Sequence, residues 1–314
     1  MIKKSDKIYI AGHRGMVGSA CWRALEAEGY TNIVGKTSKE LDLRDQKAVE
    51  EFIQTEQPVA IIDAAAKVGG ILANDTYPYE FLMNNMLIQN NLIRFAHEND
   101  VPKFIFLGSS CIYPKFAPQP LKEDYLLTGS LEPTNEWYAI AKISGVKVIE
   151  ALRKEHGRDY VSLMPTNLYG PNDNFDFMSS HVVPAMIRKF HEAKINGNTP
   201  VELWGTGSPM REFLHVDDLG QAVLFALENK FEEHIYNVGT GADLTIKELA
   251  TLIQTIVGHK GEIKWDISKP DGTPRKLMDT RKYNSHGWKA HIDLRQGVSK
   301  TYAWFLDNSS NQRL

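Results

Sequence analysis

The stretch "IYIAGHRGMVGSA" at residues 8–20 decides the fold. It joins a short apolar run to Gly12, Gly15 and Gly18, spaced as GxxGxxG, and a helical pattern follows at once. Glycines at such a junction permit a tight turn and close backbone approach, so a pyrophosphate can sit on the amino terminus of the helix. The stretch therefore predicts the opening of a dinucleotide-binding fold; the alternative is a glycine-rich turn that serves only helix packing.

The first half of the chain alternates short apolar runs with segments of helical period. Because the runs are apolar throughout, they indicate a parallel sheet covered on both faces. We therefore predict the α/β class, with a doubly wound parallel sheet of the Rossmann type. Its strands are expected at 8–11, near 33, and at 59–63, 104–108 and 160–165, and its helices at 16–28, 46–55, 79–99 and 136–155.

The composition changes after Pro165, where loops rich in Asn, Pro and Gly appear, such as "TNLYGPNDNF" and "WGTGSPMREF". Loops at the carboxyl side of a parallel sheet commonly cover a ligand. We predict a cofactor domain over residues 1–168, with a returning segment near 212–240. A smaller, loop-rich α/β substrate domain is expected over 169–211 and 241–314.

Composition excludes several classes of protein. The 314 residues are 42% hydrophobic and carry a formal net charge of −3 without a dense basic block, which argues against nucleic-acid and membrane-surface partners. No apolar run approaches a membrane span. Cys21 and Cys111 lie far apart and offer neither a disulfide framework nor metal-ligand spacing. We expect a soluble, cytoplasmic protein with a small-molecule partner and no metal.

The end of the second predicted strand distinguishes NAD from NADP. An acidic residue there would hold the ribose 2′-hydroxyl of NAD, but "NIVGKTSKE" contains no acid before Glu40. Basic and hydroxyl groups are available instead, namely Arg14 in the glycine loop, Lys36 and Ser38. We therefore predict NADP(H), with its 2′-phosphate near these groups; their alternative role is that of solvated surface residues.

Tyr138 and Lys142 in "NEWYAIAKISG" lie four residues apart, on one face of a predicted helix. Ser109 ends the fourth predicted strand. Because a neighbouring ammonium lowers the pKa of a phenol, we expect Lys142 to lower the pKa of Tyr138. Tyr138 would then donate a proton to a carbonyl, Ser109 would bond the same oxygen, and Lys142 would hold the cofactor ribose. The combination predicts hydride transfer to a ketone.

The two cysteines, Cys111 and Cys21, are predicted to have different roles. In "FLGSSCIYP" at 106–114, extended geometry would point Ser109 and Cys111 to the same side, because side chains alternate along a strand. Cys111 would then face the same ligand as Ser109, although a plain core cysteine is the alternative. Cys21 in "GSACWRAL" is expected to lie in the core.

Nearly the whole chain resembles the extended short-chain dehydrogenase/reductases that act on nucleotide sugars. The resemblance is carried by the glycine loop, Ser109, the Tyr138/Lys142 pair, "NLYGP" at 167–171, "REFLHVDDL" at 211–219 and "YNVGTG" at 236–241. More narrowly, "AAAKVGGI", "GSSCIYPK", "MPTNLYGPNDNF" and "SKPDGTPRK" are similar to the GDP-L-fucose synthase family. That resemblance implies a homodimer that catalyses NADPH-dependent 3,5-epimerisation and 4-keto reduction of GDP-4-keto-6-deoxy-D-mannose, in GDP-fucose biosynthesis.

The resemblance also implies roles for individual residues. Cys111 and His181 match the pair that exchanges the protons on C3 and C5, with the direction of transfer left open. The positions matching the GDP-sugar site are Lys189, Trp204, Arg211 and Asp271. Arg188 is an alternative to Lys189, and a buried structural role is an alternative for Trp204.

The full predicted cofactor site combines the glycine loop, the ends of the second, fourth and fifth strands, and the helix that carries the tyrosine. Asp42 and Leu43 are expected near the adenine, and Asn167 and Leu168 near the nicotinamide. The members of the site are Gly12, His13, Arg14, Gly15, Met16, Val17, Gly18, Lys36, Ser38, Asp42, Leu43, Leu107, Gly108, Ser109, Ser110, Tyr138, Lys142, Pro165, Thr166, Asn167, Leu168 and His181.

Two other functions share part of this sequence pattern. A nucleotide-sugar 4-epimerase or 4,6-dehydratase shares the Ser, Tyr and Lys, but uses NAD and tends to have an acidic second-strand end. A dehydratase would also place an Asp-Glu pair where this sequence has Ser110-Cys111-Ile112. A non-catalytic NADP-binding regulator would typically lose the Tyr/Lys pair, which this chain retains.

Overall fold

A six-stranded parallel sheet organises the first part of the chain. In the computed structural model, which describes residues 2–177, 179–269 and 271–308, the strand order is β2-β1-β3-β4-β5-β9. Neighbouring strands pair in parallel throughout. The strands are β1 (Ile8–Ala11), β2 (Ile33–Val34), β3 (Ala60–Asp63), β4 (Lys103–Leu107), β5 (Asp159–Pro165) and β9 (Ile235–Val238). The predicted doubly wound α/β fold is confirmed.

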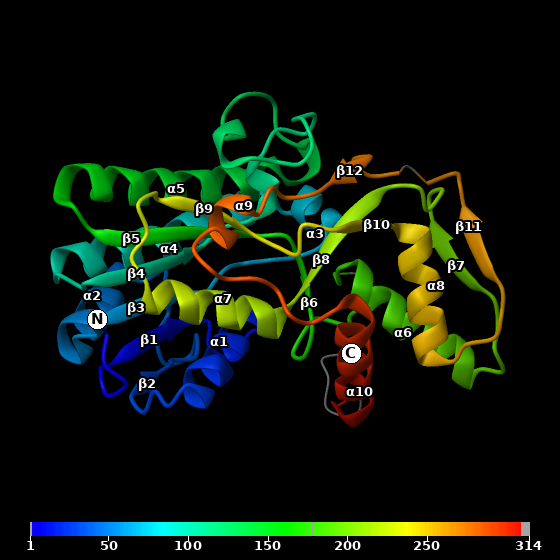
Figure 1. The fold of residues 1–314 in the computed structure, drawn as a ribbon, viewed down its shortest axis with the longest axis horizontal. Helices are drawn as coiled ribbons and strands as arrows, with labels where there is room; N and C mark the ends of the chain where they lie inside the picture. Colours follow the sequence, from blue (N-terminus) through cyan, green and yellow to red (C-terminus); the bar gives the residue numbers. More distant parts are fainter. Residues whose placement is uncertain (1, 178, 270, 309–314) are drawn as a thin grey trace.

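Helices cover both faces of this sheet (Figure 1). The first face is covered by α1 (Met16–Ala27) and α7 (Val216–Glu228), which pack against each other. The other face is covered by α2 (Gln46–Glu56), α4 (Pro78–Glu98) and α5 (Glu136–His156), with α4 packed along α5. The short helix α3 (Ile71–Thr76) precedes α4. Within the described ranges, no helix combines the length and apolar character needed to cross a membrane.

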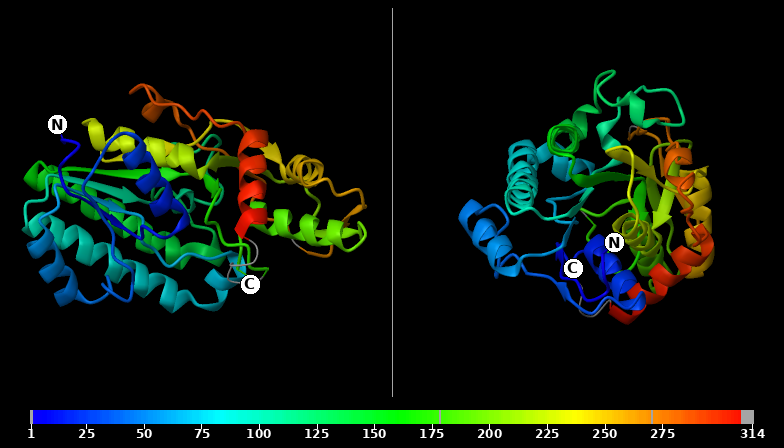
Figure 2. Two further views of the ribbon diagram at one scale, coloured as in Figure 1. Left: turned by 90° about the horizontal axis from the view of Figure 1, so that it is seen from below. Right: turned by 60° about the vertical axis from the view of Figure 1, so that its left-hand side comes forward.

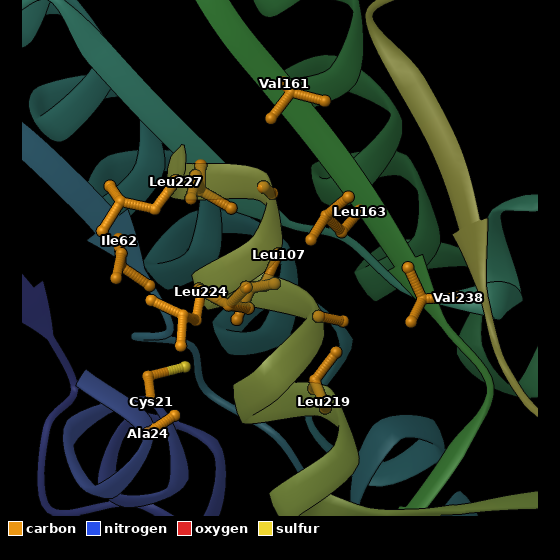
Figure 3. Packing of buried hydrophobic residues seen from close by; sticks show 14 of the residues in the cluster. Cys21, Ala24, Ile62, Leu107, Val161, Leu163, Leu219, Leu224, Leu227 and Val238 are labelled. Atoms are coloured by element: carbon orange, nitrogen blue, oxygen red, sulfur yellow. The ribbon is translucent and has the colours of Figure 1, made fainter. Parts of the chain in front are cut away.

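The core between the sheet and the α1/α7 layer explains one of the two cysteines. Figure 3 shows side chains of α1 and α7 pointing toward strand residues that include Ile62, Leu107 and Val161. Cys21 lies among them with 1% of its surface exposed, and burial raises the pKa of its thiol to about 12. The predicted core role of Cys21 is confirmed, because a thiol held neutral in apolar surroundings is inert.

The second part of the structure extends from the carboxyl end of the central sheet, and Figure 2 shows α6 and α8 at the far end of the molecule. It has its own core cluster, built around Ile187, Phe190 and Ile253. Its helices are α6 (Val182–Ile195), α8 (Ile246–Val257) and α10 (Leu294–Asn308), and its strands are β6 (Asn167–Tyr169), β7 (Val201–Trp204), β8 (Met210–His215), β10 (Asp243–Thr245), β11 (Ile263–Asp266) and β12 (Arg275–Lys276). The short helix α9 (Arg281–Asn284) returns to the central sheet, where it packs against β9. Residues 309–314 of the predicted substrate domain lie outside the described residues.

The extended geometry expected from Ser109 to Cys111 is wrong. Strand β4 ends at Leu107, and the 3₁₀ helix η1 (Ser110–Ile112) follows. The cause is local: the Ser109 hydroxyl oxygen accepts a hydrogen bond from the backbone N–H of Cys111 at 3.3 Å, which caps the turn. Two further 3₁₀ helices follow, η2 (Glu123–Tyr125) and η3 (Pro133–Asn135).

Asn237 in β9 fixes the long loop that follows this turn. Its side-chain oxygen accepts from the Tyr113 hydroxyl at 2.6 Å, and its amide donates to the Leu121 carbonyl at 2.9 Å. Its backbone N–H donates to the Glu123 carboxylate at 2.8 Å. Because Asn237 is fully buried, removal of its side chain would leave the Tyr113 hydroxyl and the Leu121 carbonyl without a water replacement.

We expect Asn237→Ala to lower the free energy of unfolding by about 2–4 kcal/mol, since it leaves buried hydrogen-bonding groups unpaired and opens a small cavity. Urea denaturation followed by circular dichroism measures the change. The matched control is Asn229→Ala, because Asn229 is exposed and donates to the Phe225 carbonyl. Equal stability of Asn237→Ala and the unaltered protein would contradict the proposed locking of this loop.

Candidate active site

The glycine turn after β1 forms a cradle for a dinucleotide. Gly12 has φ +76°, and a Cβ there would lie 2.8 Å from the Ala64 carbonyl oxygen. A Cβ on Gly18 would lie 2.2 Å from the Gly12 carbonyl oxygen, so α1 can approach the turn only with glycine at that position. No side chain caps the amino terminus of α1, and its first turn has no acid. The open N–H groups suit a pyrophosphate, at the point between β1 and β3 where the strand order reverses.

The surroundings of β2 fit a 2′-phosphate. Arg14 and Lys36 both act electrostatically on Glu40, so the two cations share one neighbourhood. The Glu40 carboxylate itself is engaged by the backbone N–H and the hydroxyl of Thr37 at 2.8 and 2.6 Å, and these bonds lower its pKa. Ser38 is exposed in the same turn. The residues present therefore fit NADP.

Other predicted cofactor residues lie around this cradle. Asp42 forms an ion pair with Arg44 at 2.7 Å, and the Leu43 carbonyl accepts from the Asn91 amide at 2.9 Å. The His13 ring lies 5.7 Å from the Trp22 ring, centre to centre, and burial lowers its pKa. Gly15 caps α1, and Met16 and Val17 begin it.

The carboxyl ends of β4 and β5 lie beside each other. Leu107 ends β4 and pairs with Leu163, and the Gly108 N–H donates to the Leu163 carbonyl at 2.9 Å. The Asn167 amide donates to the Glu212 carbonyl at 2.8 Å, which fixes the chain after β5. The remaining predicted residues of these ends are Ser110 in η1, Pro165 at the end of β5, the buried Thr166, and Leu168 in β6.

Tyr138 and Lys142 extend from α5 toward these strand ends. The Lys142 ammonium donates to the Leu107 carbonyl at 2.8 Å and lies 4.7 Å from the centre of the Phe106 ring. It lies 5.9 Å from the centre of the Tyr138 ring. Phe81 of α4 packs edge-on against Tyr138, with ring centres 6.5 Å apart. The predicted pair is therefore assembled at the end of β4, where Ser109 follows.

The expectation that Lys142 lowers the pKa of Tyr138 is wrong. Burial raises the pKa of Tyr138 far above its ordinary value, and the negative potential of Cys111 and Asp63 adds to this shift. Burial also lowers the pKa of Lys142, while Asp63 and Cys111 raise it. Desolvation dominates both groups because neither lies in bulk water. The phenol stays protonated, which is the form that a proton donor requires.

Cys111 lies in the same group although the chain turns before it. It is 8% exposed, and burial raises the pKa of its thiol. The Lys276 ammonium opposes that rise most, followed by a hydrogen bond with the Ser109 side chain and by Lys142. Lys276 comes from β12, and its place beside Cys111 follows from the pairing of β12 with β8.

His181 stands apart from Cys111. It is the amino-terminal cap residue of α6 and is exposed, yet desolvation by the protein around its ring lowers its pKa. Its segment is tied to the loop after β3, where the Gly70 N–H donates to the Ser179 carbonyl at 3.1 Å. Across the described residues, no hydrogen bond or ion pair joins His181 to Cys111. The predicted pair is therefore not joined by a direct bond between the two side chains.

The predicted GDP-sugar residues belong to the second part of the structure. The Lys189 ammonium donates to the Glu202 carbonyl at 3.1 Å, whereas the adjacent Arg188 pairs with Glu192 at 2.8 Å. Arg211 pairs in register with Lys276, and no carboxylate in the described ranges forms an ion pair with its half-buried guanidinium. Among the described residues, Lys189 and Arg211 thus bond backbone carbonyls and have no carboxylate partner, whereas Arg188 has one.

Trp204 and Asp271 lie on the outer strands and loops of this part. Trp204 is 68% exposed, so the alternative of a buried structural role is wrong. The Lys269 ammonium lies 5.5 Å from the centre of a Trp204 ring. Asp271 accepts from the N–H and hydroxyl of Thr206 at 2.9 and 2.7 Å.

Asp63 was not predicted as a site residue. It ends β3 and is fully buried beside Tyr138 and Lys142. Its signal was present in "VAIID", because an acid closing an otherwise apolar strand of a parallel sheet lies at the edge where ligands bind. Lys276 had no such signal, since its neighbourhood depends on the pairing of β12 with β8.

Comparisons with known proteins agree with this geometry. The NAD dependent epimerase/dehydratase family matches residues 8–239. GDP-L-fucose synthase 1 of Arabidopsis thaliana is 58% identical, over 99% of this chain and 97% of that protein. The GDP-L-fucose synthase of Escherichia coli (strain K12) is 53% identical, over 98% and 99% respectively. A solved GDP-L-fucose synthetase from Naegleria fowleri bound to NADP has a TM-score of 0.92 at 28% identity, covering 100% of this chain and 96% of that one. The chain therefore belongs to the NAD dependent epimerase/dehydratase family and, within it, to the same group as the GDP-L-fucose synthases.

Proposed function

We propose that the protein is an NADPH-dependent GDP-L-fucose synthase, which epimerises GDP-4-keto-6-deoxy-D-mannose at C3 and C5 and reduces its 4-keto group. The observation that carries this proposal is the grouping of Cys111 with Ser109, Tyr138 and Lys142 at the ends of parallel strands. Cys111 distinguishes an epimerase-reductase from a plain reductase. Ser109, Tyr138 and Lys142 are the residues suited to reduction of a ketone. Identity of 58% and 53% to a plant and a bacterial GDP-L-fucose synthase supports the substrate.

Epimerisation starts from the acidity of the protons on C3 and C5. Both carbons are alpha to the C4 ketone, so loss of either proton leaves an enolate whose oxygen can accept hydrogen bonds from Ser109 and Tyr138. Inversion requires one group to remove the proton and another to return one on the opposite face. Cys111 lies in η1 and His181 caps α6, so the two groups come from separate elements, which suits a pair that would act on opposite faces of a sugar ring. Burial keeps both groups uncharged at neutral pH, by raising one pKa and lowering the other.

Reduction uses the same oxygen. Bound NADPH supplies a hydride to C4, and the Tyr138 hydroxyl donates the proton that converts the ketone oxygen to an alcohol. The raised pKa of Tyr138 keeps that proton available until the oxygen becomes basic. Lys142, which the Leu107 carbonyl fixes at the end of β4, would hold the cofactor ribose.

We also propose the division of labour between the two parts. Residues 1–168, with the segment near 212–240, would bind NADP, while 169–211 and 241–314 would hold the GDP-sugar. Lys189 and Arg211 supply unpaired cations for the two phosphates, and a planar guanidinium suits such a group. The exposed Trp204 offers a surface for the base or the sugar, and Asp271 lies nearby in the loop that Thr206 holds.

A homodimer and a cytoplasmic location complete the proposal. Large apolar side chains are exposed along the outer face of α4 and α5, namely Leu87, Trp137, Ile140 and Val148. An apolar face on two adjacent long helices is suited to packing against a second copy of itself. Cys21 and Cys111 are both free thiols, the state that a reducing compartment maintains.

Deuterium incorporation separates the two reactions. With GDP-4-keto-6-deoxy-D-mannose and NADPH in deuterated water, we expect deuterium at both C3 and C5 of the GDP-fucose product. Tyr138→Phe should slow hydride transfer about 10²- to 10⁴-fold and exchange much less, because it removes the proton donor. Cys111→Ser should slow exchange more than reduction of a substrate that is already epimerised. Mass spectrometry and NADPH absorbance measure the two rates.

The control for these variants is Cys21→Ser, which changes a cysteine that lies in the core on the far face of the sheet. It should alter stability and leave the ratio of exchange to reduction unchanged. Reduction without exchange in the unaltered protein would remove Cys111 and His181 from the chemistry. Equal loss of both activities in folded Cys111→Ser would contradict a dedicated acid or base role.

Selection of NADPH should depend on Arg14 and Lys36. Replacing either by Ala should raise the KM for NADPH about 10- to 100-fold, because a charge-assisted bond to the 2′-phosphate is lost. The KM for NADH should change little, since NADH lacks that phosphate. Steady-state kinetics with both cofactors measure the difference. Lys47→Ala, on the exposed side of α2, should leave both values unchanged; equal effects on NADH and NADPH would refute a 2′-phosphate contact.

Assembly should depend on the outer face of α5. Val148→Glu places a charge on the proposed dimer face and should convert the protein to a monomer, as measured by size-exclusion chromatography with light scattering. Ile195→Glu is the matched control, because Ile195 is an exposed isoleucine at the end of α6. A monomeric mass for the unaltered protein would overturn the homodimer.

A further inference from the structure

Asp63 is a buried carboxylate that the chemistry above does not use. It is the last residue of β3 and has no exposed surface. One carboxylate oxygen accepts from the Ala65 N–H at 3.2 Å, while Oδ2 is buried without a hydrogen-bond partner among the described residues. An unpaired buried carboxylate oxygen is destabilising, and a positive charge nearby would offset that cost.

Strand alternation shows which way Asp63 points. Ile62 packs in the cluster beneath α1 and α7, and Ile61 packs in the cluster beneath α4 and α5. Because successive side chains of a strand face opposite sides, Asp63 shares the side of Ile61. It also pairs in register with Phe106 of β4, which belongs to the same cluster as Ile61. The carboxylate therefore lies beside the Phe106 ring, under α5.

The Lys142 ammonium lies over that same ring. Its nitrogen is 4.7 Å from the centre of Phe106, and the residue is 3% exposed. An ammonium has three donor protons, yet in the described structure only the Leu107 carbonyl accepts from it, at 2.8 Å. The site thus holds a buried cation short of acceptors next to a buried anion short of donors.

We propose that Asp63 is a positioning residue of the candidate active site, the buried counter-ion that keeps Lys142 charged and directed across the end of β4. The pairing itself is independent of the reaction, and only its consequence for catalysis rests on the proposed function. Asp63 acts on the reacting groups through Lys142 and need not touch substrate.

The electrostatic surroundings agree with this assignment. The titratable groups that interact with Asp63 are Tyr9 from β1 and Tyr138 and Lys142 from α5, and Cys111 acts on Lys142 in addition. The buried polar residues of α4 are uncharged, namely Asn85, Gln89 and Asn91. Burial raises the pKa of Asp63 to about 6 against the opposing effect of Lys142, so the carboxylate is ionised at neutral pH.

Asp63→Asn tests the proposal, because it removes the charge, preserves the shape and retains an acceptor for the Ala65 N–H. Loss of the anion favours the uncharged amine, so Lys142 should lose its proton at lower pH, by about one unit or more. The measurement is the ¹³Cε shift of Lys142 against pH in lysine-labelled protein, assigned by its absence in Lys142→Arg. The alkaline limb of ketone reduction should move down by the same amount.

Glu123→Gln is the matched control. Glu123 is also a buried acid with a raised pKa, but it accepts from the Asn237 N–H and has no interaction with Lys142. Its removal should leave the Lys142 titration unmoved. If the pKa of Lys142 is the same in Asp63→Asn as in the unaltered protein, the proposal is overturned.

The unaltered protein also decides the matter if Asp63→Asn does not fold. The Lys142 shift should then show a first step near pH 6, as Asp63 takes up its proton, and a second step as Lys142 loses its own. A single step overturns the pairing. Since this readout needs no substrate, absence of ketone reduction would refute the proposed function and leave the pairing intact.

Discussion

The strands of the central sheet run parallel, and this constraint brings their carboxyl ends to one edge. The glycine turn follows β1, Asp63 ends β3, Ser109 and Cys111 follow β4, and Asn167 follows β5. Residues that are distant in the chain become neighbours without any long loop having to position them. Helix α5 approaches this edge from the side, and its Lys142 is anchored to the edge by the Leu107 carbonyl.

Desolvation governs the chemistry available at that edge. It raises the pKa of Tyr138 and Cys111, lowers that of Lys142 and His181, and so favours the uncharged form of each. Uncharged Tyr138, Cys111 and His181 can enter proton transfer without first breaking an ion pair. The cations nearest to Cys111 and the anion nearest to Lys142 then set how far each departs from neutrality.

Much of the fold could be predicted because the central strands are short apolar runs, and such runs, alternating with helices, are typical of a parallel sheet buried on both faces. The Tyr138/Lys142 pair was also visible, since a spacing of four fixes the shared face of a helix. The conformation at Cys111 was not, because the Ser109 hydroxyl competes for a backbone N–H and ends the strand. The pKa of Tyr138 depends on tertiary burial, and the place of Lys276 depends on pairing between distant strands.

The turn at η1 couples Ser109 to Cys111. In the proposed mechanism the Ser109 hydroxyl bonds the ketone oxygen, and the same hydroxyl oxygen holds the turn that carries Cys111. Under that proposal, a change at Ser109 would disturb reduction and epimerisation together, because the thiol would lose its anchored turn. A change at Cys111 alone would leave the Ser109 hydroxyl in place and would disturb epimerisation only.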